Sequence, residues 1–169
     1  MKTAILRLSV TIRQWLTTLI ICLAFLPGMA QDGAYSDADR IGSHVHKLVN
    51  QYRNTINRHR LKRISSLDAI ALGHAKNVAS GRVPFSHEGF QDRVKAIKEE
   101  APFPFVAGEN LYGIDNPARY VGKRALDGWI DSPPHLKNLK GDFLFTGIGV
   151  ARSPDGEWIV CQIYVGKYE

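Results

Sequence analysis

The feature that most constrains the fold is a pair of strand-like segments at the C-terminal end. Ile148 and Val150 alternate with glycines, and after turn residues at 154–156 a second run, 158–165, alternates again. A period of two on both sides of a short turn predicts a β-hairpin. Both faces of the second run are largely apolar, so we expect both faces of the sheet to be covered, and helices must cover them.

Four other segments have the spacing of amphipathic helices, with apolar residues three and four positions apart. They are Ile41–Tyr52, Leu67–Val78, Phe90–Ile97 and Val121–Ile130. Ser65 and Asp68 have the spacing of a capping box at the start of the second helix, and Gly81 supplies the left-handed residue with which helices commonly end. His74 lies on the apolar face of this helix, so we expect a hydrogen-bonded histidine in the core.

The stretch from Gly108 to His135 contains the best candidate site. We expect a turn at Gly108–Tyr112 that presents Glu109. Asn116 and the proline after it form a helix start signal. The helix is expected to end before the consecutive prolines 133 and 134, since each lacks an N–H donor. His135 would then leave a rigid corner, and Glu109 and His135 would stand at the ends of two turns joined by one packed helix.

A second candidate is His87, which precedes the third helix and lies between two aromatic residues. This position suits a side chain that is presented at the end of an element better than one in the core. Arg93, six residues later, can pair with a carboxylate such as Glu109. The alternative for Arg93 is a surface salt bridge of little energetic weight.

The first thirty residues have the pattern of a secretory signal. Three basic residues precede an apolar segment at 15–26, and small residues end at Ala30. About 12 apolar residues are too few for the roughly 20 of a membrane span. We therefore expect a signal peptide over 1–30, a flexible lead-in over 31–40 and one domain over 41–169. The protein is expected to be extracellular or periplasmic after cleavage near Ala30, with no transmembrane segment in its mature form.

Charge and cysteine content exclude some classes of function. The 169 residues carry a net charge of +6, and three of the positive charges lie in residues 1–30. A nucleic-acid interface needs clustered basic residues interleaved with aromatics; the densest basic run, 53–63, is interpreted as a solvated helix end and loop. No nucleic-acid partner is expected. Cys161 is the one cysteine after cleavage, and in the middle of an apolar strand its thiol is expected to be inert.

Six motifs, in order along the chain, resemble the CAP superfamily, the secreted domains that include cysteine-rich secretory proteins, antigen 5 and plant pathogenesis-related proteins. The likeness is closest to the short bacterial branch. The motifs are Leu67-Asp68 with Ala71 and Ala75, Ser86-His87 with Phe90 and Arg93, Gly108-Glu109-Asn110-Leu111, Trp129 to Leu139, Gly147-Ile148-Gly149, and Gln162. Trp129 to Leu139 is similar to the bacterial motif Trp-x-x-Ser-Pro-x-His-x-x-Asn.

The resemblance implies an α+β fold, a three-layer α-β-α sandwich with a small antiparallel sheet between helices, and a surface cleft. In eukaryotic members this cleft holds two His and two Glu, and in several it binds zinc or another divalent ion. His87 and Glu109 match two of these four positions, whereas Ser132 and Ile159 stand where those members have Glu and His. His135 belongs to the bacterial motif and is the candidate to replace the missing imidazole.

We therefore expect a ligand-binding cleft formed by His87, Glu109, His135, Arg93 and Asn110. Within it, His87, Glu109 and His135 are the candidate metal ligands. Two imidazoles and a carboxylate with one position open to water suit zinc. Calcium or magnesium would need more oxygen ligands.

The favoured function is a secreted, monomeric, non-catalytic binding module for a lipid, a sterol or a cell-envelope component. No nucleophile with an adjacent base is evident, and catalysis by Ser or Cys requires one. The alternative is a metal-assisted hydrolase or peptidase acting outside the cell, with the metal in the cleft and Glu88 as the base.

Overall fold

The computed structural model describes residues 36–100 and 103–167. These residues form five helices and four strands: α1 (Asp37–Thr55), β1 (Lys62–Arg63), α2 (Ser65–Ala79), α3 (Phe90–Glu100), β2 (Phe105–Ile114), α4 (Ala118–Ile130), α5 (Pro133–Lys140), β3 (Phe145–Arg152) and β4 (Trp158–Lys167). The expected signal peptide, and the part of the lead-in before residue 36, lie outside the described residues.

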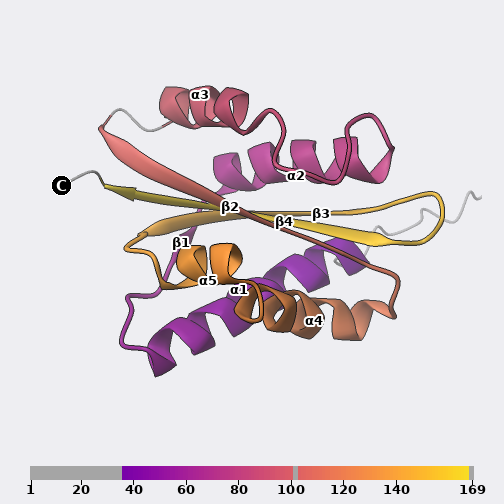
Figure 1. The fold of residues 1–169 in the computed structure, drawn as a ribbon, viewed down its shortest axis with the longest axis horizontal. Helices are drawn as coiled ribbons and strands as arrows, with labels where there is room; N and C mark the ends of the chain where they lie inside the picture. The colour runs from indigo at the N-terminus through magenta and orange to yellow at the C-terminus, as the bar shows by residue number, and fades with distance from the viewer. Residues whose placement is uncertain (1–35, 101–102, 168–169) are drawn as a thin grey trace, which may run out of the picture. The chain divides into compact units, whose positions relative to one another are not determined.

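The elements are arranged in three layers, with α2 and α3 on one face of the sheet and α1, α4 and α5 on the other (Figure 1). The strand order is β1-β3-β4-β2. β2, β3 and β4 are antiparallel, as expected, but the two-residue strand β1 runs parallel to β3. The predicted α-β-α sandwich is confirmed, and its sheet is mixed.

The predicted C-terminal hairpin is confirmed as β3 and β4, which pair from Phe145 with Val165 to Arg152 with Trp158. Alternate residues of β4 belong to two separate cores. Ile159 and Ile163 pack under α2 and α3. Val160 and Tyr164 pack against the layer of α1 and α4. The strand is apolar on both faces because a helical layer covers each face.

Two glycines allow α2 to lie directly on β3. A Cβ atom added to Gly147 would overlap the backbone of Leu67, and one added to Gly149 would overlap the backbone at Leu72. Neither overlap can be relieved by rotating a side chain. The Gly147-Ile148-Gly149 motif is therefore required by the close approach of helix and strand.

Two helix starts differ from the prediction. α1 begins at Asp37, inside the expected lead-in, because Ser36 and Asp39 form a capping box there. The capping box predicted for α2 is wrong: Ser65 is the first residue of that helix and its start has no side-chain cap. The carboxylate of Asp68 is bonded elsewhere, since it accepts from the Arg63 Nε at 2.9 Å and from the backbone N–H of Ile148 at 2.7 Å.

The turn predicted at Gly108–Tyr112 is wrong, because these residues lie in the middle of β2. They pair with β4 from Gly108 opposite Tyr164 to Tyr112 opposite Val160. The local glycine signal is overridden by pairing with a strand about fifty residues away, which supplies backbone hydrogen bonds along the whole segment. Glu109 is therefore held by a sheet and not by a turn.

The two prolines after α4 also act differently from the prediction. Pro133 and Pro134 begin a new helix, α5, and His135 lies in its first turn. Proline is tolerated there because the first N–H groups of a helix have no intrahelical partner. The packed helix between the two segments is confirmed as α4, but its N-cap residue is Pro117, so Asn116 does not cap it.

No helix in the described part of the chain is long and apolar enough to cross a membrane.

Trp129 is the residue of α4 whose loss should destabilise the domain most. Its side chain is fully buried, and its Nε1 donates to the Leu111 carbonyl at 3.1 Å. Trp129→Ala should lower the free energy of unfolding by about 3–5 kcal/mol, the range for deleting a large buried aromatic. Denaturant unfolding measures this. Tyr120→Ala, at an exposed position of the same helix, is the control and should change it by less than about 0.5 kcal/mol. Equal losses would contradict the assigned packing.

Candidate functional site

Glu109 is the centre of a cluster of polar side chains at the β2 edge. Its side chain is only 2 % exposed and faces the layer of α2 and α3. Arg93 of α3 donates to both carboxylate oxygens, from Nε to Oε2 at 2.6 Å and from Nη2 to Oε1 at 2.7 Å. The pairing predicted for these two residues is confirmed. Because the pair is bidentate and buried, it differs from the weak surface salt bridge that was the alternative.

His87 contacts the same carboxylate. Its Nδ1 lies 2.8 Å from Oε1 of Glu109, and its side chain is 47 % exposed. Gly89, with φ of +74°, turns the chain from His87 into α3. The Arg93 Nη1 also donates to the Glu88 carbonyl at 3.1 Å. The contacts of His87 and Arg93 thus hold the segment before α3 against β2. The His87 side chain is presented at the end of an element, as expected.

Two residues that the sequence analysis did not connect with Glu109 also reach it. The His74 Nε2 lies 3.8 Å from Oε1, and the Cys161 Sγ lies 3.7 Å from Oε2. His74 is hydrogen-bonded to the Ser86 carbonyl at 3.0 Å, so the predicted core histidine is confirmed. The sequence signal for these contacts was the position of His74 on an apolar helix face. That position predicts burial, and a buried imidazole requires polar partners.

Burial shifts both of these groups toward their neutral forms. Desolvation lowers the pKa of His74 from its ordinary value, although the charge of Glu109 opposes this effect. Desolvation, with a further contribution from Glu109, raises the pKa of the Cys161 thiol well above its ordinary value. A protonated, fully buried thiol is a poor nucleophile, in agreement with the prediction for Cys161.

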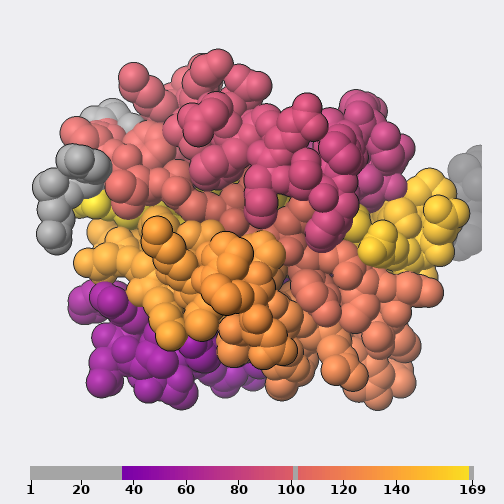
Figure 2. All heavy atoms as spheres, viewed as in Figure 1, coloured from indigo at the N-terminus to yellow at the C-terminus, as the bar shows by residue number. Residues whose placement is uncertain are grey.

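His135 approaches the cluster from the opposite helical layer. Its ring lies 5.8 Å from the ring of His87, at an angle of 66°. Burial lowers the pKa of His135, and the nearby His87 lowers it further. Figure 2 shows the segment before α3 and the helix α5 meeting on one face of the domain. The structure therefore brings His87, Glu109, His135 and Arg93 together, as the sequence analysis expected.

Asn110 has a different position from the other four residues. It is fully buried on the other face of β2, where its Nδ2 donates to the His135 carbonyl and to the Tyr164 hydroxyl, both at 3.2 Å. The Asn138 Nδ2 donates to the Asn110 Oδ1 at 2.9 Å and to the Glu109 carbonyl at 3.0 Å. Asn110 and Asn138 therefore attach α5 to β2, and Asn110 lies beneath the cluster and not at its surface.

A hollow of about 430 Å³ adjoins this cluster between α2 and α3. His74, Glu88 and Arg93 are among the residues that line it. Ser86, beside it, is used in a local turn, since its Oγ accepts from the Glu88 backbone N–H at 3.2 Å. The Ser86 hydroxyl is thus used in a backbone turn, and the Cys161 thiol is buried against the Glu109 carboxylate.

The residues of the cluster fit a three-ligand zinc site poorly. Both oxygens of Glu109 accept from Arg93, so a metal ion there would have to displace a guanidinium and then face its charge. No three His, Cys, Asp or Glu side chains within residues 36–100 and 103–167 are grouped so that they could hold a metal ion.

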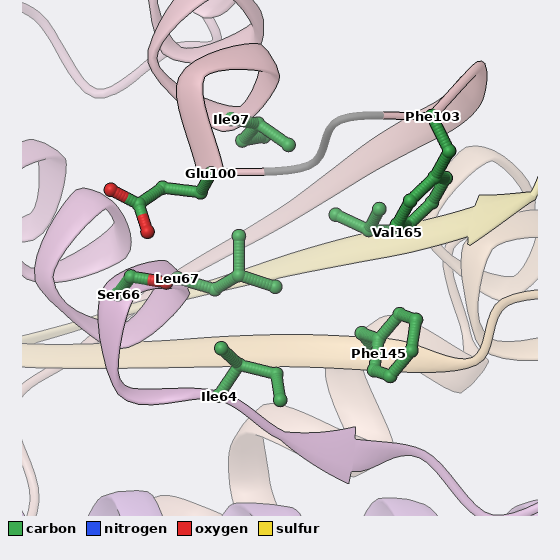
Figure 3. A pocket seen from close by; sticks show the side chains of 8 residues that line it. All are labelled: Ile64, Ser66, Leu67, Ile97, Glu100, Phe103, Phe145 and Val165. Carbon is green, nitrogen blue, oxygen red and sulfur yellow. The ribbon is translucent and has the colours of Figure 1, made fainter.

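A separate cavity of about 140 Å³ lies between α2, α3 and the sheet. Figure 3 shows its lining residues, which are mainly apolar: Ile64, Ser66, Leu67, Ile97, Glu100, Phe103, Phe145 and Val165. The sequence has no local signal for this cavity, because its walls come from segments a hundred residues apart. The cavity and the Glu109 cluster have no lining residue in common.

Comparisons with known proteins point to one family. The model of the cysteine-rich secretory protein family, CAP, matches residues 46–164. No match is found among curated proteins. Among solved structures, an extracellular SCP-domain protein of Bacillus anthracis is 26 % identical, with a TM-score of 0.62 over 77 % of this chain. An outer surface protein of Borrelia burgdorferi is 16 % identical, with a TM-score of 0.62 over 76 % of this chain.

A cysteine-rich secretory protein of Staphylococcus aureus is 16 % identical, with a TM-score of 0.60 over 79 % of this chain. The chain spans 94 % of the length of the Borrelia protein, but only 41 % of the B. anthracis and S. aureus proteins. At 16 % identity, the Borrelia and S. aureus structures support the fold alone.

The stability of the domain should fall as the pH drops below about 6.5. Because burial lowers the pKa of His74, the unfolded chain takes up a proton at a higher pH than the folded chain does. The free energy of unfolding therefore decreases with pH from about 6.5 downward, by at most about 1.4 kcal/mol per pH unit for this one group. Urea unfolding at pH 7.5 and 5.5 measures this decrease.

The test compares His74→Gln with His59→Gln, a substitution in an exposed loop. His74→Gln should have a smaller pH dependence than the wild type, whereas His59→Gln should retain the wild-type slope. An unchanged slope in His74→Gln would contradict the assignment of a buried, neutral His74.

Proposed function

The chain belongs to the cysteine-rich secretory protein (CAP) family, and we propose that it is a secreted, non-catalytic binding module for a small hydrophobic ligand. A lipid, a sterol or an apolar cell-envelope component belongs to this class of ligand. The observation that carries the proposal is the apolar cavity between α2, α3 and the sheet.

The size and lining of this cavity suit an apolar group. An enclosed cavity of about 150 Å³ lined by Leu, Ile and Phe accepts a molecule of the size of benzene. The present cavity is about 140 Å³, is partly open to solvent and is walled by Leu67, Ile97, Phe145 and other apolar side chains. Transfer of apolar surface from water into such a space is favourable by about 25 cal/mol per Å².

The chemistry of the Glu109 cluster supports a non-catalytic role. A general base must be able to accept a proton, and Glu109 is instead neutralised by Arg93 through two short hydrogen bonds. The Cys161 thiol is buried and has a raised pKa. Both groups are thereby engaged in stabilising the fold around β2.

Secretion is part of the proposal. The first thirty residues have the basic, apolar and small-residue pattern of a cleaved signal. The B. anthracis protein to which the chain is similar is described as extracellular. Cleavage near Ala30 would release the domain that begins with α1.

The second candidate function is the metal-assisted hydrolase. It is favoured by the two imidazoles of His87 and His135, whose rings are 5.8 Å apart. A metal bound between them would polarise a substrate carbonyl or activate water. This candidate requires a metal ion to displace Arg93 from Glu109, or to bind at a site formed by two imidazoles and water only. Zinc at this site stays a prediction.

The binding proposal predicts that 1-octanol, a neutral apolar ligand, binds in the cavity. Two-dimensional NMR titration of the labelled mature protein should show saturable shifts at Leu67, Ile97 and Val165. Ser66→Trp would fill the cavity from its lining and should abolish these shifts. Ser65→Trp, at the exposed neighbouring position of α2, should retain them. Absence of saturable shifts in the wild type would overturn the proposal.

The hydrolase alternative predicts zinc binding that depends on both histidines. Imidazoles bind metal only when neutral, so zinc affinity at pH 7.5 should be much higher than at pH 5, and His87→Ala and His135→Ala should each weaken it. Calorimetric titration of metal-free protein measures this. Our proposal predicts that both variants give the same titration curves as the wild type. Loss of binding in both would establish the metal site and favour the alternative.

A further inference from the structure

We infer that the hollow between α2 and α3 is a second ligand site, which binds a small aliphatic primary amine in its ammonium form. The side chains of His74, Glu88 and Asp92 accept the N–H groups of this ammonium. The inference goes beyond the proposed function, because the hollow and the apolar cavity have no lining residue in common. Figure 1 shows α2 and α3 on the same face of the sheet.

The hollow exists because small residues line it on both helices. Ala69 and Gly73 of α2 and Ala96 of α3 are among its lining residues, and so is Gly89, directly before α3. A Cβ atom added to Gly73 would meet no other atom within 4 Å. The volume of about 430 Å³ lies within the range of about 300–1,000 Å³ that is usual for small-molecule sites. The space is therefore large enough for a small ligand.

The buried ring of His74 has one nitrogen that donates and one that is left to accept. Its Nε2 lies 3.0 Å from the Ser86 carbonyl oxygen and 3.8 Å from the carboxylate of Glu109. A carbonyl and a carboxylate only accept hydrogen bonds, so Nε2 carries the proton and donates it. In a neutral imidazole the other nitrogen is then an acceptor. The Nδ1 atom of His74 therefore offers a lone pair.

This lone pair opens into the hollow. Within residues 36–100 and 103–167, the hydrogen bond of the His74 side chain is made by Nε2 and not by Nδ1. In the same part of the chain, no buried side-chain nitrogen or oxygen lacks a partner. Nδ1 is therefore reachable from outside, although the His74 side chain is only 2 % exposed. Because His74 lines the hollow, water or a ligand with N–H or O–H groups reaches Nδ1 from there.

Two carboxylates favour a cation among the possible donors. Glu88 and Asp92 also line the hollow and are exposed. In the described part of the chain, no ion pair includes Glu88. Asp92 pairs with Lys95 at 2.8 Å, but both side chains are more than three-quarters exposed, so this pair is weak. The guanidinium of Arg93, which also lines the hollow, is neutralised by Glu109. The remaining charge is negative.

An aliphatic ammonium matches these groups. It has three N–H donors and no acceptor, as the lysine side chain has, and like lysine it is protonated at neutral pH. The three acceptors are Nδ1 of His74 and the two carboxylates. Ile70 and Val83 supply apolar wall for the carbon chain. A metal ion fits less well, because no three His, Cys, Asp or Glu side chains of the described residues are grouped to hold one.

The test compares three ligands that share a butyl chain: butylammonium, butan-1-ol and butyltrimethylammonium. In NMR titrations of the labelled mature protein at pH 7.5 and low ionic strength, butylammonium should give saturable shifts at the amides of Gly73 and Gly89. Butan-1-ol lacks the charge and should bind about three- to tenfold more weakly, as expected for two exposed charge pairs. Butyltrimethylammonium keeps the charge but has no N–H donor, so it should also bind about three- to tenfold more weakly.

The ring nitrogens of His74 can be observed directly, without a substitution in the core. A long-range proton–nitrogen spectrum should show a protonated Nε2 and an unprotonated Nδ1. The Nδ1 resonance should shift when butylammonium binds, because that nitrogen accepts a hydrogen bond from the ligand. A protonated Nδ1, or an Nδ1 resonance that stays in place at saturation, would overturn the role of His74.

Variants of the two acids test the origin of the preference for a cation. Glu88→Gln and Asp92→Asn should each lower the affinity for butylammonium about threefold, consistent with one exposed charge pair each. Neither should change the affinity for butan-1-ol. Glu99→Gln, at an exposed position of α3 outside the lining of the hollow, is the matched control and should change neither affinity.

A variant that fills the hollow tests the location of the site. Gly73→Leu should abolish the saturable shift at Gly89, and it should fold because leucine is more favourable than glycine inside a helix. Lys76→Leu, at another exposed position of α2 that does not line the hollow, should retain the shift.

The possible results separate this inference from the proposed function. Saturable binding of butylammonium that survives in Gly73→Leu would place the ligand elsewhere and overturn the inference. Equal affinity for the three ligands would overturn the selection of an ammonium group. Absence of saturable shifts with butylammonium would overturn the site itself. None of these results affects the proposed function, because 1-octanol is tested by shifts at Leu67, Ile97 and Val165 in the separate apolar cavity.

Discussion

The fold depends on how the buried carboxylate of Glu109 is neutralised. An ionised carboxylate that is removed from water is stable only with charged and hydrogen-bonding partners. Arg93 supplies a bidentate pair and His87 a further contact, so α3 and the segment before it are fixed to β2. On the other side of the same strand, Asn138 and Trp129 donate to the carbonyls of Glu109 and Leu111. These bonds attach α4 and α5, and they occupy backbone acceptors of an edge strand that would otherwise be open to pairing.

This arrangement is the reason why we propose a structural role for the residues that most resemble an active site. Separating Glu109 from Arg93 would remove both guanidinium hydrogen bonds from a carboxylate that is only 2 % exposed. Breaking such a pair by removing one partner typically costs about 3–5 kcal/mol. His87 and His135 complete the contact between the two helical layers at the β2 edge. The apolar cavity in which we place the ligand lies under α2 and α3, apart from the larger hollow of about 430 Å³ that adjoins the cluster.

Much of the fold was predictable because its strongest signals are local or periodic. The two apolar faces of β4 predicted a covered sheet, and the position of His74 on an apolar helix face predicted its burial. The pairing of Arg93 with Glu109 followed from their charges. The turn predicted at Gly108–Tyr112 was wrong because this segment pairs with β4. The local preference of glycine for turns does not reveal that pairing. The two prolines predict a helix end, but they begin α5, because proline is equally suited to a helix start. The cavity could not be predicted, because Ile64, Ile97 and Val165 meet only in the folded chain.

The central claim is that the cavity, and not the Glu109 cluster, holds the ligand. A crystal structure of the mature protein grown with both 1-octanol and zinc tests this most directly. The account predicts electron density for 1-octanol beside Leu67 and Val165, with Glu109 still paired with Arg93. An anomalous zinc peak bound by His87, Glu109 and His135, together with an empty cavity, would contradict it.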